Sequence, residues 1–284
     1  MKIYSFNIEN FKVDGGAMFG VVPKAIWNRV YPSDENNLIP LAIRLMLIDT
    51  GDRVILIDNG IGNKQDEKFL SHVYRFGGEG LIDGLAKRGY NPADITDVVL
   101  THLHFDHCGG GIKLNPDGSF ALTFPNAKYH ISRAQWEWAI NSNAREASSF
   151  LSENLLPMRD LGALNLIENE GELVPGVYLR IFNGHTRGQI IPIITYKGKS
   201  IVFVADLFPF RANLPLSYIA SYDVEPMVTL KEKETFLEES LAGDYIFYYQ
   251  HDYFSECSRV VNTPRGIRAT EGFTFDTFLK EFSE

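Results

Sequence analysis

The run Thr101-His-Leu-His-Phe-Asp-His-Cys-Gly-Gly110 places four side chains that commonly bind metal ions within six residues. In His102-x-His104 the two imidazoles share one side of an extended segment, because side chains alternate along such a segment. Asp106 and His107 follow as the chain turns, and they offer a second pair of ligands to a second ion. A lone histidine is more often structural, but four such groups beside a glycine run favour a metal site.

The segments around this run predict an α/β protein. Leu41–Asp49 and Arg53–Asp58 are β-rich and are separated by Thr50-Gly51-Asp52, which predicts a hairpin. Asp97–Leu100 is expected to be a buried strand, so the histidine run is a loop at the carboxyl end of a strand. Further strands are expected at Ala127–Ile131, Val177–Phe182, Ile190–Tyr196, Ser200–Ala205 and Tyr245–Gln250, and helices at Leu81–Arg88, Arg133–Asn141 and, with a capping box at Thr229–Glu232, up to Leu241. Strands punctuated by helices indicate a sheet core with helices outside it.

Length and composition narrow the class of protein. The 284 residues are 45% hydrophobic and 22% charged, and they contain no linker or repeat, which predicts one domain over residues 1–284. The net charge of −9 argues against a nucleic-acid partner. No stretch approaches the ~18 apolar residues needed to span a bilayer, so no membrane is expected. Two cysteines, Cys108 and Cys257, are too few for a disulfide framework and predict a reducing cytoplasm.

The histidine run resembles the H-x-H-x-D-H signature of the metallo-β-lactamase superfamily. The family's other motifs follow in order: Asp58 after a strand, His185 in Gly184-His185-Thr186, Asp206 in Val204-Ala205-Asp206 and His251 in Gln250-His251-Asp252. The resemblance spans Leu41 to Asp252. It implies a four-layer αββα sandwich with its metal site at one edge.

The resemblance also implies the ligands of two divalent ions. The first is held by His102, His104 and His185, the second by Asp106, His107 and His251, and Asp206 bridges them. Two such ions share a hydroxide whose pKa they lower, and this hydroxide is the nucleophile, with Asp106 as a proton shuttle. Asp58 is expected to hydrogen-bond near the histidine loop and to fix its orientation. Zinc suits these ligands best, although iron, manganese or cobalt also fit.

Departures from the family pattern narrow the reaction. His104 stands where redox di-iron relatives carry Glu, which favours hydrolysis, and the family's β-lactamases lack either His107 or Asp206. The stretch from Asp14 to Trp27 resembles the leader of the acyl-homoserine lactonase and methyl parathion hydrolase-like branch. That branch implies that residues 1–37 pack over the site, and it implies a homodimer.

The substrate predicted from this branch is a small ester. We expect a lactone, such as an acyl-homoserine lactone, to be opened; the alternatives are phosphotriester or aryl-ester hydrolysis, glyoxalase-type thioester hydrolysis, and ligand binding without turnover. Some lactonases carry a Tyr three residues after the bridging Asp, where this chain has Pro209, and Tyr218 or Tyr222 are its candidate substitutes. An apolar pocket for the substrate, or else plain core packing, is expected at Met18, Phe19, Trp27, Phe105, Phe208, Tyr218 and Tyr222.

Overall fold

The computed structural model describes residues 1–282, which form two compact units, each built from three stretches of chain. Unit 1 consists of Met1–Asn10, Ile43–Asn169 and Arg187–Ile190. Unit 2 consists of Phe11–Ala42, Glu170–Thr186 and the chain from Ile191 onward. Three strands, β1 (Lys2–Asp14), β2 (Leu38–Asp49) and β11 (Gln189–Tyr196), contribute residues to both units.

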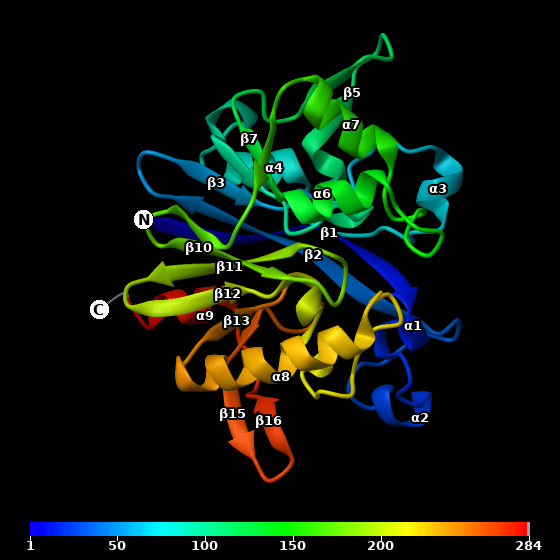
Figure 1. Ribbon diagram of the computed structural model, residues 1–284, viewed down its shortest axis with the longest axis vertical. Helices are drawn as coiled ribbons and strands as arrows, with labels where there is room; N and C mark the ends of the chain where they lie inside the picture. The colour runs from blue at the N-terminus through cyan, green and yellow to red at the C-terminus, as the bar shows by residue number, and fades with distance from the viewer. Residues whose placement is uncertain (283–284) are drawn as a thin grey trace. The chain divides into compact units, whose positions relative to one another are not determined.

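Most of unit 1 is built on a mixed six-stranded sheet with the order β1-β2-β3-β4-β7-β8 (Figure 1). Its other strands are β3 (Val54–Ile57), β4 (Asp97–Val99), β7 (Lys128–Ser132) and β8 (Leu164–Ile167), and its helices are α3 (Glu67–Ser71), α4 (Leu81–Lys87), α5 (Phe105–Cys108), α6 (Arg133–Ile140) and α7 (Ser152–Asp160). A small hairpin joins β5 (Ile112–Leu114) to β6 (Phe120–Leu122). Strands β3 and β4 are fully buried at Leu56 and Val98, as expected of parallel strands that are covered on both faces.

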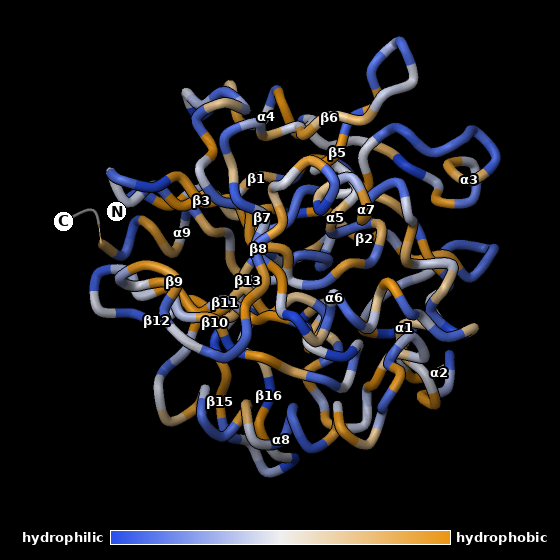
Figure 2. Tube along the Cα trace, turned by 45° about the horizontal axis from the view of Figure 1, so that its top comes forward, coloured by the Kyte–Doolittle hydropathy of each residue, from blue (hydrophilic) through white to orange (hydrophobic). Residues whose placement is uncertain are grey.

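Unit 2 carries a second mixed six-stranded sheet, with the order β14-β13-β12-β11-β10-β9. Its strands are β9 (Gly171–Val174), β10 (Val177–Phe182), β11 (Gln189–Tyr196), β12 (Lys199–Phe203), β13 (Ile246–Tyr248) and β14 (Cys257–Ser258). Figure 2 shows hydrophobic residues concentrated along β11 and β13. The turn between β11 and β12 has positive φ angles at Lys197 and Gly198, as in a tight hairpin turn.

The helices of unit 2 and a second hairpin complete the fold. The helices are α1 (Gly15–Phe19), α2 (Lys24–Trp27), α8 (Pro226–Ala242) and α9 (Phe275–Lys280), and the hairpin pairs β15 (Val260–Thr263) with β16 (Gly266–Ala269). Helix α8 lies against this hairpin (Figure 1). None of the helices in residues 1–282 has the length and apolar content that a bilayer span requires.

Three details differ from the sequence prediction. The histidine run is not a loop throughout, because Phe105–Cys108 forms the short helix α5. Strand β12 ends at Phe203, and Ala205 begins a 3-10 turn with φ of 39°. Helix α8 begins at Pro226 rather than at Thr229, so the proposed capping box lies inside the helix, where the favourable fixed φ of a first-turn proline sets the start instead.

Candidate metal centre

The ligand residues of unit 1 leave the sheet at the carboxyl ends of neighbouring strands. Strands β3 and β4 are parallel, with Ile57 opposite Val99, so the residues that follow them meet at one edge. The side chains of His102 and His104 turn toward each other there, with His102 Nε2 3.0 Å from His104 Nδ1. Their imidazole rings are nearly perpendicular, at 82°. Two nitrogens that face a common point in this way suit one metal ion.

Asp106 and His107 extend this group. Nε2 of His107 lies 3.6 Å from Oδ2 of Asp106, and the His102 and His107 rings lie 3.8 Å apart. His102, His104 and His107 are buried, and the side chain of Asp106 is 13% exposed. The structure therefore brings the four predicted ligands of unit 1 together; we call them donor set 1.

Asp58 supports donor set 1 through hydrogen bonds. Its carboxylate accepts hydrogen bonds from Thr101 N at 2.7 Å and Thr101 Oγ1 at 2.8 Å, and its Oδ2 lies 2.9 Å from His107 Nδ1. Because a carboxylate only accepts, His107 carries its proton on Nδ1, which leaves the Nε2 lone pair for a metal. Asp58 also has φ of 56°, a left-handed conformation that non-glycine residues adopt rarely and often at functional sites.

The glycine run after His107 is required by close backbone contacts. A Cβ at Gly109 would lie 1.9 Å from the carbonyl oxygen of Ile61, and one at Gly110 would lie 2.1 Å from that of Asn59. Only glycine allows the segment after β3 to pass so close. The thiol of Cys108 is buried here and donates to Leu103 O at 3.4 Å, and burial raises its pKa. A thiol with a raised pKa is a poor metal ligand, so we assign Cys108 to packing.

Unit 2 supplies the other three predicted ligands, which we call donor set 2. Strands β12 and β13 are parallel, with Phe203 opposite Tyr248, so Asp206 and His251 follow neighbouring strand ends. Oδ2 of Asp206 lies 3.2 Å from His185 Nε2, and Oδ1 lies 3.3 Å from His251 Nε2. The two carboxylate oxygens of Asp206 are thus directed at different histidines.

Both histidines of donor set 2 are oriented through their other ring nitrogen. Nδ1 of His251 lies 2.8 Å from the carbonyl oxygen of Ala42, and Nδ1 of His185 lies 2.8 Å from Oδ1 of Asp223. Each acceptor fixes the proton on Nδ1 and directs the Nε2 lone pair toward Asp206. Sequence reasoning missed Asp223, because no motif surrounds it.

Helix α8 fixes the loop that carries His185. The Glu232 carboxylate accepts from Asn183 N at 2.7 Å and Gly184 N at 3.0 Å. A Cβ at Gly184 would lie 2.4 Å from the backbone nitrogen of Thr229, so the loop approaches the helix as closely as glycine permits. The residues that the sequence suggested as a capping box therefore hold a ligand loop instead.

Lys233, on the same helix, is 1% exposed and holds the segment after Asp206. Its ammonium group donates to the carbonyl oxygens of Asn213 at 2.6 Å, Tyr218 at 2.9 Å and Pro215 at 3.2 Å. Burial lowers the pKa of Lys233 to about 7. One buried side chain thus fixes three backbone groups.

The predicted pocket residues fall into separate groups. In unit 2, the Phe19 ring stacks on Trp27 at 5.0 Å and meets Tyr218 edge-on at 5.9 Å, while Met18 O accepts from Asn213 Nδ2. Phe208 is buried against Phe247, and Tyr222 is 46% exposed. In unit 1, Phe105 meets Phe69 edge-on at 5.1 Å. Their role in binding substrate stays a prediction.

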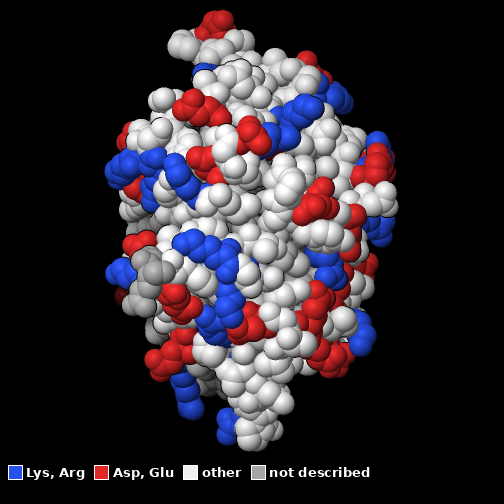
Figure 3. Space-filling model, turned by 90° about the vertical axis from the view of Figure 1, so that its left-hand side faces the viewer, with Lys and Arg blue, Asp and Glu red and all other residues white. Residues whose placement is uncertain are grey.

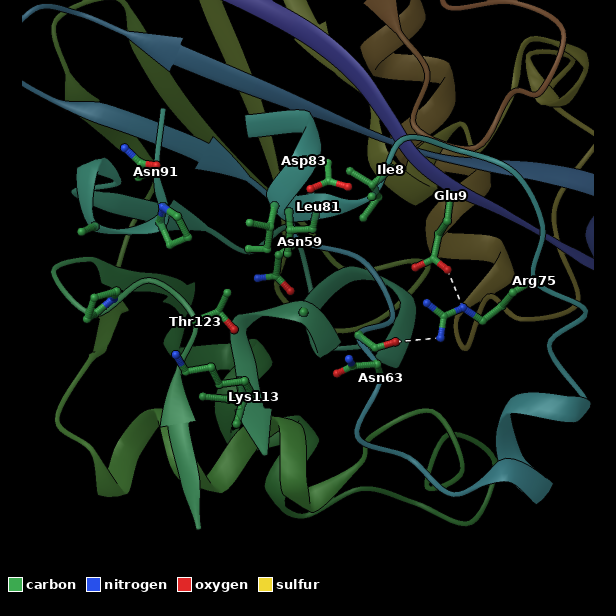
Figure 4. Close-up of a pocket in the computed structure, with 18 of the residues that line it drawn as sticks. Ile8, Glu9, Asn59, Asn63, Arg75, Leu81, Asp83, Asn91, Lys113 and Thr123 are labelled. Atoms are coloured by element: carbon green, nitrogen blue, oxygen red, sulfur yellow. Dashed lines mark hydrogen bonds and ion pairs between the residues drawn. The ribbon is translucent and has the colours of Figure 1, made fainter. Parts of the chain in front are cut away.

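A cavity in unit 1 has a volume of about 960 Å³ and is lined by none of the residues of donor set 1. In Figure 4, Glu9 and Arg75 point toward each other across one side of it and form an ion pair. Burial raises the pKa of Glu9, although Arg75 opposes that shift.

Acidic and basic side chains are interspersed on the face of the molecule that Figure 3 shows.

His130, which matched no motif, has a structural role. Its Nε2 donates to Asp97 Oδ1 at 2.6 Å, and its Nδ1 accepts from Asn165 Nδ2 at 2.9 Å. Both nitrogens are satisfied within the sheet, so this histidine differs from those of the donor sets.

Similar known proteins identify the family of this chain. The family model described as "Metallo-beta-lactamase superfamily" matches residues 39–251. An N-acyl homoserine lactonase from Bacillus cereus is 27% identical over 232 residues, which cover 78% of this chain and 85% of the lactonase. The solved structure of a probable metal-dependent hydrolase from Staphylococcus aureus is 32% identical, with a TM-score of 0.86 over 96% of this chain and 98% of that one.

A dizinc quorum-quenching lactonase, AidC, crystallised with its product, shares the fold at a TM-score of 0.79 and 20% identity, over 96% of this chain and 95% of AidC. The predicted fold class is thus confirmed, with two mixed sheets and a mixture of helices and strands. Imidazoles and carboxylates are the donors that a catalytic zinc or a similar ion prefers, so the buried histidines and the partly exposed Asp106 and Asp206 fit a metal-dependent hydrolase. The matched family model and the Staphylococcus aureus relative together show that this chain belongs to the metallo-beta-lactamase superfamily.

Proposed function

We propose that this protein is a dinuclear metal-dependent hydrolase that opens a lactone or a similar ester. The proposal rests on the orientation of the Asp206 carboxylate. Its two oxygens are directed at two different histidines, as expected of a carboxylate that bridges two ions. In the proposed ligand assignment, the first ion is bound by His102, His104 and His185, the second by Asp106, His107 and His251, and Asp206 binds both.

The protein's own residues would orient these ligands before substrate arrives. Asp58, Asp223 and the Ala42 carbonyl each accept a hydrogen bond from one imidazole nitrogen and so set which nitrogen binds metal. When bound, the two ions supply Lewis-acid polarisation of the ester carbonyl and lower the pKa of the attacking water. The side chain of Asp106 is 13% exposed, and its carboxylate is suited to move a proton to the leaving group.

The choice of a lactone rests on the relatives. N-acyl homoserine lactonases from Bacillus match 77–78% of the chain at 26–27% identity. We therefore propose an acyl-homoserine lactone or a lactone of similar size as substrate. Zinc as the native metal, a homodimer and a cytoplasmic location are further predictions of the same proposal.

A ring-opening assay tests the proposal. Protein purified without added metal is first subjected to elemental analysis, and then assayed with acyl-homoserine lactones of increasing tail length and with a paraoxon-type phosphotriester. We expect two metal equivalents per chain and a higher kcat/KM for a lactone than for the phosphotriester. Turnover of no lactone above the buffer rate, with both metals bound, would refute the lactonase assignment, and a preference for the phosphotriester would replace it.

A further inference from the structure

Glu146 lies in the segment between α6 and α7, outside every motif of the sequence, yet its side chain is buried. A buried carboxylate is costly unless hydrogen bonds compensate for its lost hydration. Oε2 of Glu146 accepts from Trp138 Nε1 at 2.6 Å and from Asn143 Nδ2 at 3.1 Å. These two donors hold the carboxylate in a single orientation.

The other carboxylate oxygen faces a predicted metal ligand. Oε1 of Glu146 lies 3.4 Å from His104 Nε2. Because the carboxylate only accepts, this contact favours the His104 tautomer with its proton on Nε2. The lone pair then lies on Nδ1, the nitrogen that is 3.0 Å from His102 Nε2. The ring of His104 is also restrained by Phe150, whose centroid is 5.0 Å away.

Arg187 lies over the ring of Trp138, with its guanidinium 4.6 Å from the centre of the indole ring. A cation above an indole face is attracted to the ring and restricts its movement. A connected series of contacts thus runs within unit 1 from Arg187 through Trp138 and Glu146 to His104.

We propose that Glu146 is a positioning residue that sets the His104 tautomer and so presents Nδ1 to the metal, with Trp138 holding Glu146 in place. The proposal rests on the metal site proposed above, but not on the identity of the substrate. It assigns to His104 a coordinating nitrogen different from the Nε2 that Asp58 sets for His107.

The test compares Glu146→Ala, Glu146→Gln and Trp138→Phe with the wild-type protein and with Glu137→Gln, an exposed glutamate of α6 that serves as a matched control. Each metal-loaded protein is mixed with a chelator, and the rate of zinc release is measured. We expect release to be about 10–100-fold faster for Glu146→Ala, smaller increases for Glu146→Gln and Trp138→Phe, and no change for Glu137→Gln. Unfolding of each metal-free protein shows whether the fold is kept.

A second readout follows the histidine directly. Nitrogen-15 spectra of histidine-labelled protein report which ring nitrogen carries the proton, with and without metal. We expect an Nε2–H tautomer for His104 in the wild-type protein and its loss in Glu146→Ala. An unchanged release rate and an unchanged tautomer in Glu146→Ala would overturn the role of Glu146. Wild-type protein that binds no metal would refute the metal site itself, whereas missing lactone turnover would refute only the substrate.

Discussion

Asp58 and His107 are joined by a 2.9 Å contact between Oδ2 and Nδ1, although 49 residues of chain separate them. The same carboxylate accepts from the backbone nitrogen of Thr101, where the histidine run begins. One buried side chain therefore orients both the start of the run and one of its metal ligands.

Replacing Asp58 with asparagine should weaken metal binding while keeping the fold. Asparagine tolerates the positive φ at this position, but its one acceptor oxygen cannot serve both Thr101 and His107. We expect kcat/KM and metal affinity to fall about 10–100-fold. Steady-state kinetics and metal titration of Asp58→Asn measure this, with Asp117→Asn, in the exposed β5–β6 turn, as the control. Full activity in Asp58→Asn would contradict the orienting role.

Replacing Asp206 with asparagine should remove activity more completely. An amide offers one weak oxygen ligand, so it cannot bridge two cations. We expect a loss of more than about 100-fold, beyond the loss typical of residues that only orient a ligand, and fewer than two metal equivalents per chain. Elemental analysis and kinetics of Asp206→Asn are compared with the surface variant Asp244→Asn. Activity near the wild-type level would show that Asp206 does not bridge.

Lys233→Met should destabilise unit 2, because three carbonyl oxygens lose their donor. Unsatisfied buried acceptors predict a loss of about 2–4 kcal/mol in the free energy of unfolding. Chemical denaturation measures it. The control is Lys231→Met at an exposed position of the same helix, where the expected change is within about 0.5 kcal/mol.

Lys233 also predicts a pH dependence. Burial lowers its pKa in the folded protein to about 7, whereas an unfolded lysine titrates near 10.4. Between these values the unfolded chain binds more protons, so the free energy of unfolding should rise as pH increases from about 7 to 10. Denaturation curves across this range should have a smaller slope with pH in Lys233→Met. Equal slopes would mean that Lys233 stays charged in the folded protein.

Asp97 predicts how the free energy of unfolding changes at acidic pH. Burial by itself raises the pKa of Asp97, but hydrogen bonds from His130, Arg53 and Thr96 outweigh it and hold the pKa well below its usual range. The stabilisation is therefore present above about pH 3.9, the ordinary pKa of an aspartate, and is lost as pH falls below it.

The corresponding variant, Asp97→Asn, should lose about 3 kcal/mol of unfolding free energy at neutral pH, because a partner of a buried charged network is removed. Chemical denaturation between pH 2.5 and 6 should show a weaker acid dependence than in wild type. Asp52→Asn, in the exposed β2–β3 turn, serves as the control and should follow the wild-type curve.

The sequence was sufficient for the features that depend on local pattern. Alternating and buried apolar runs predicted the β2–β3 hairpin and β10, and the strand before the histidine run predicted where donor set 1 emerges. Asp58 could be predicted because it belongs to a family motif and directly follows a predicted strand, which places it at the end of that strand.

Features that depend on tertiary contact could not be predicted in this way. Glu146 and Asp223 lie in irregular segments, and only folding brings their carboxylates against histidines far away in sequence. The spacing from Thr229 to Glu232 suggested a helix start, but the two residues pack against the segment around Gly184. The sequence pattern of an amphipathic helix predicts a surface position for Lys233, whereas the structure shows that Lys233 is buried.

The division of β1 and β2 between the two units restricts how the protein can be made or rearranged. A single cut at any bond leaves at least one unit without part of its chain, because each unit is assembled from separated stretches. Fragments carrying one donor set alone are therefore expected to fold poorly, and synthesis of the N-terminal half on the ribosome cannot complete either unit. Pairings over such long sequence separations also imply slow folding compared with proteins of local topology. An inserted segment should be tolerated best in exposed turns such as that between β15 and β16. An insertion there does not interrupt the strands and loops that carry the donor sets.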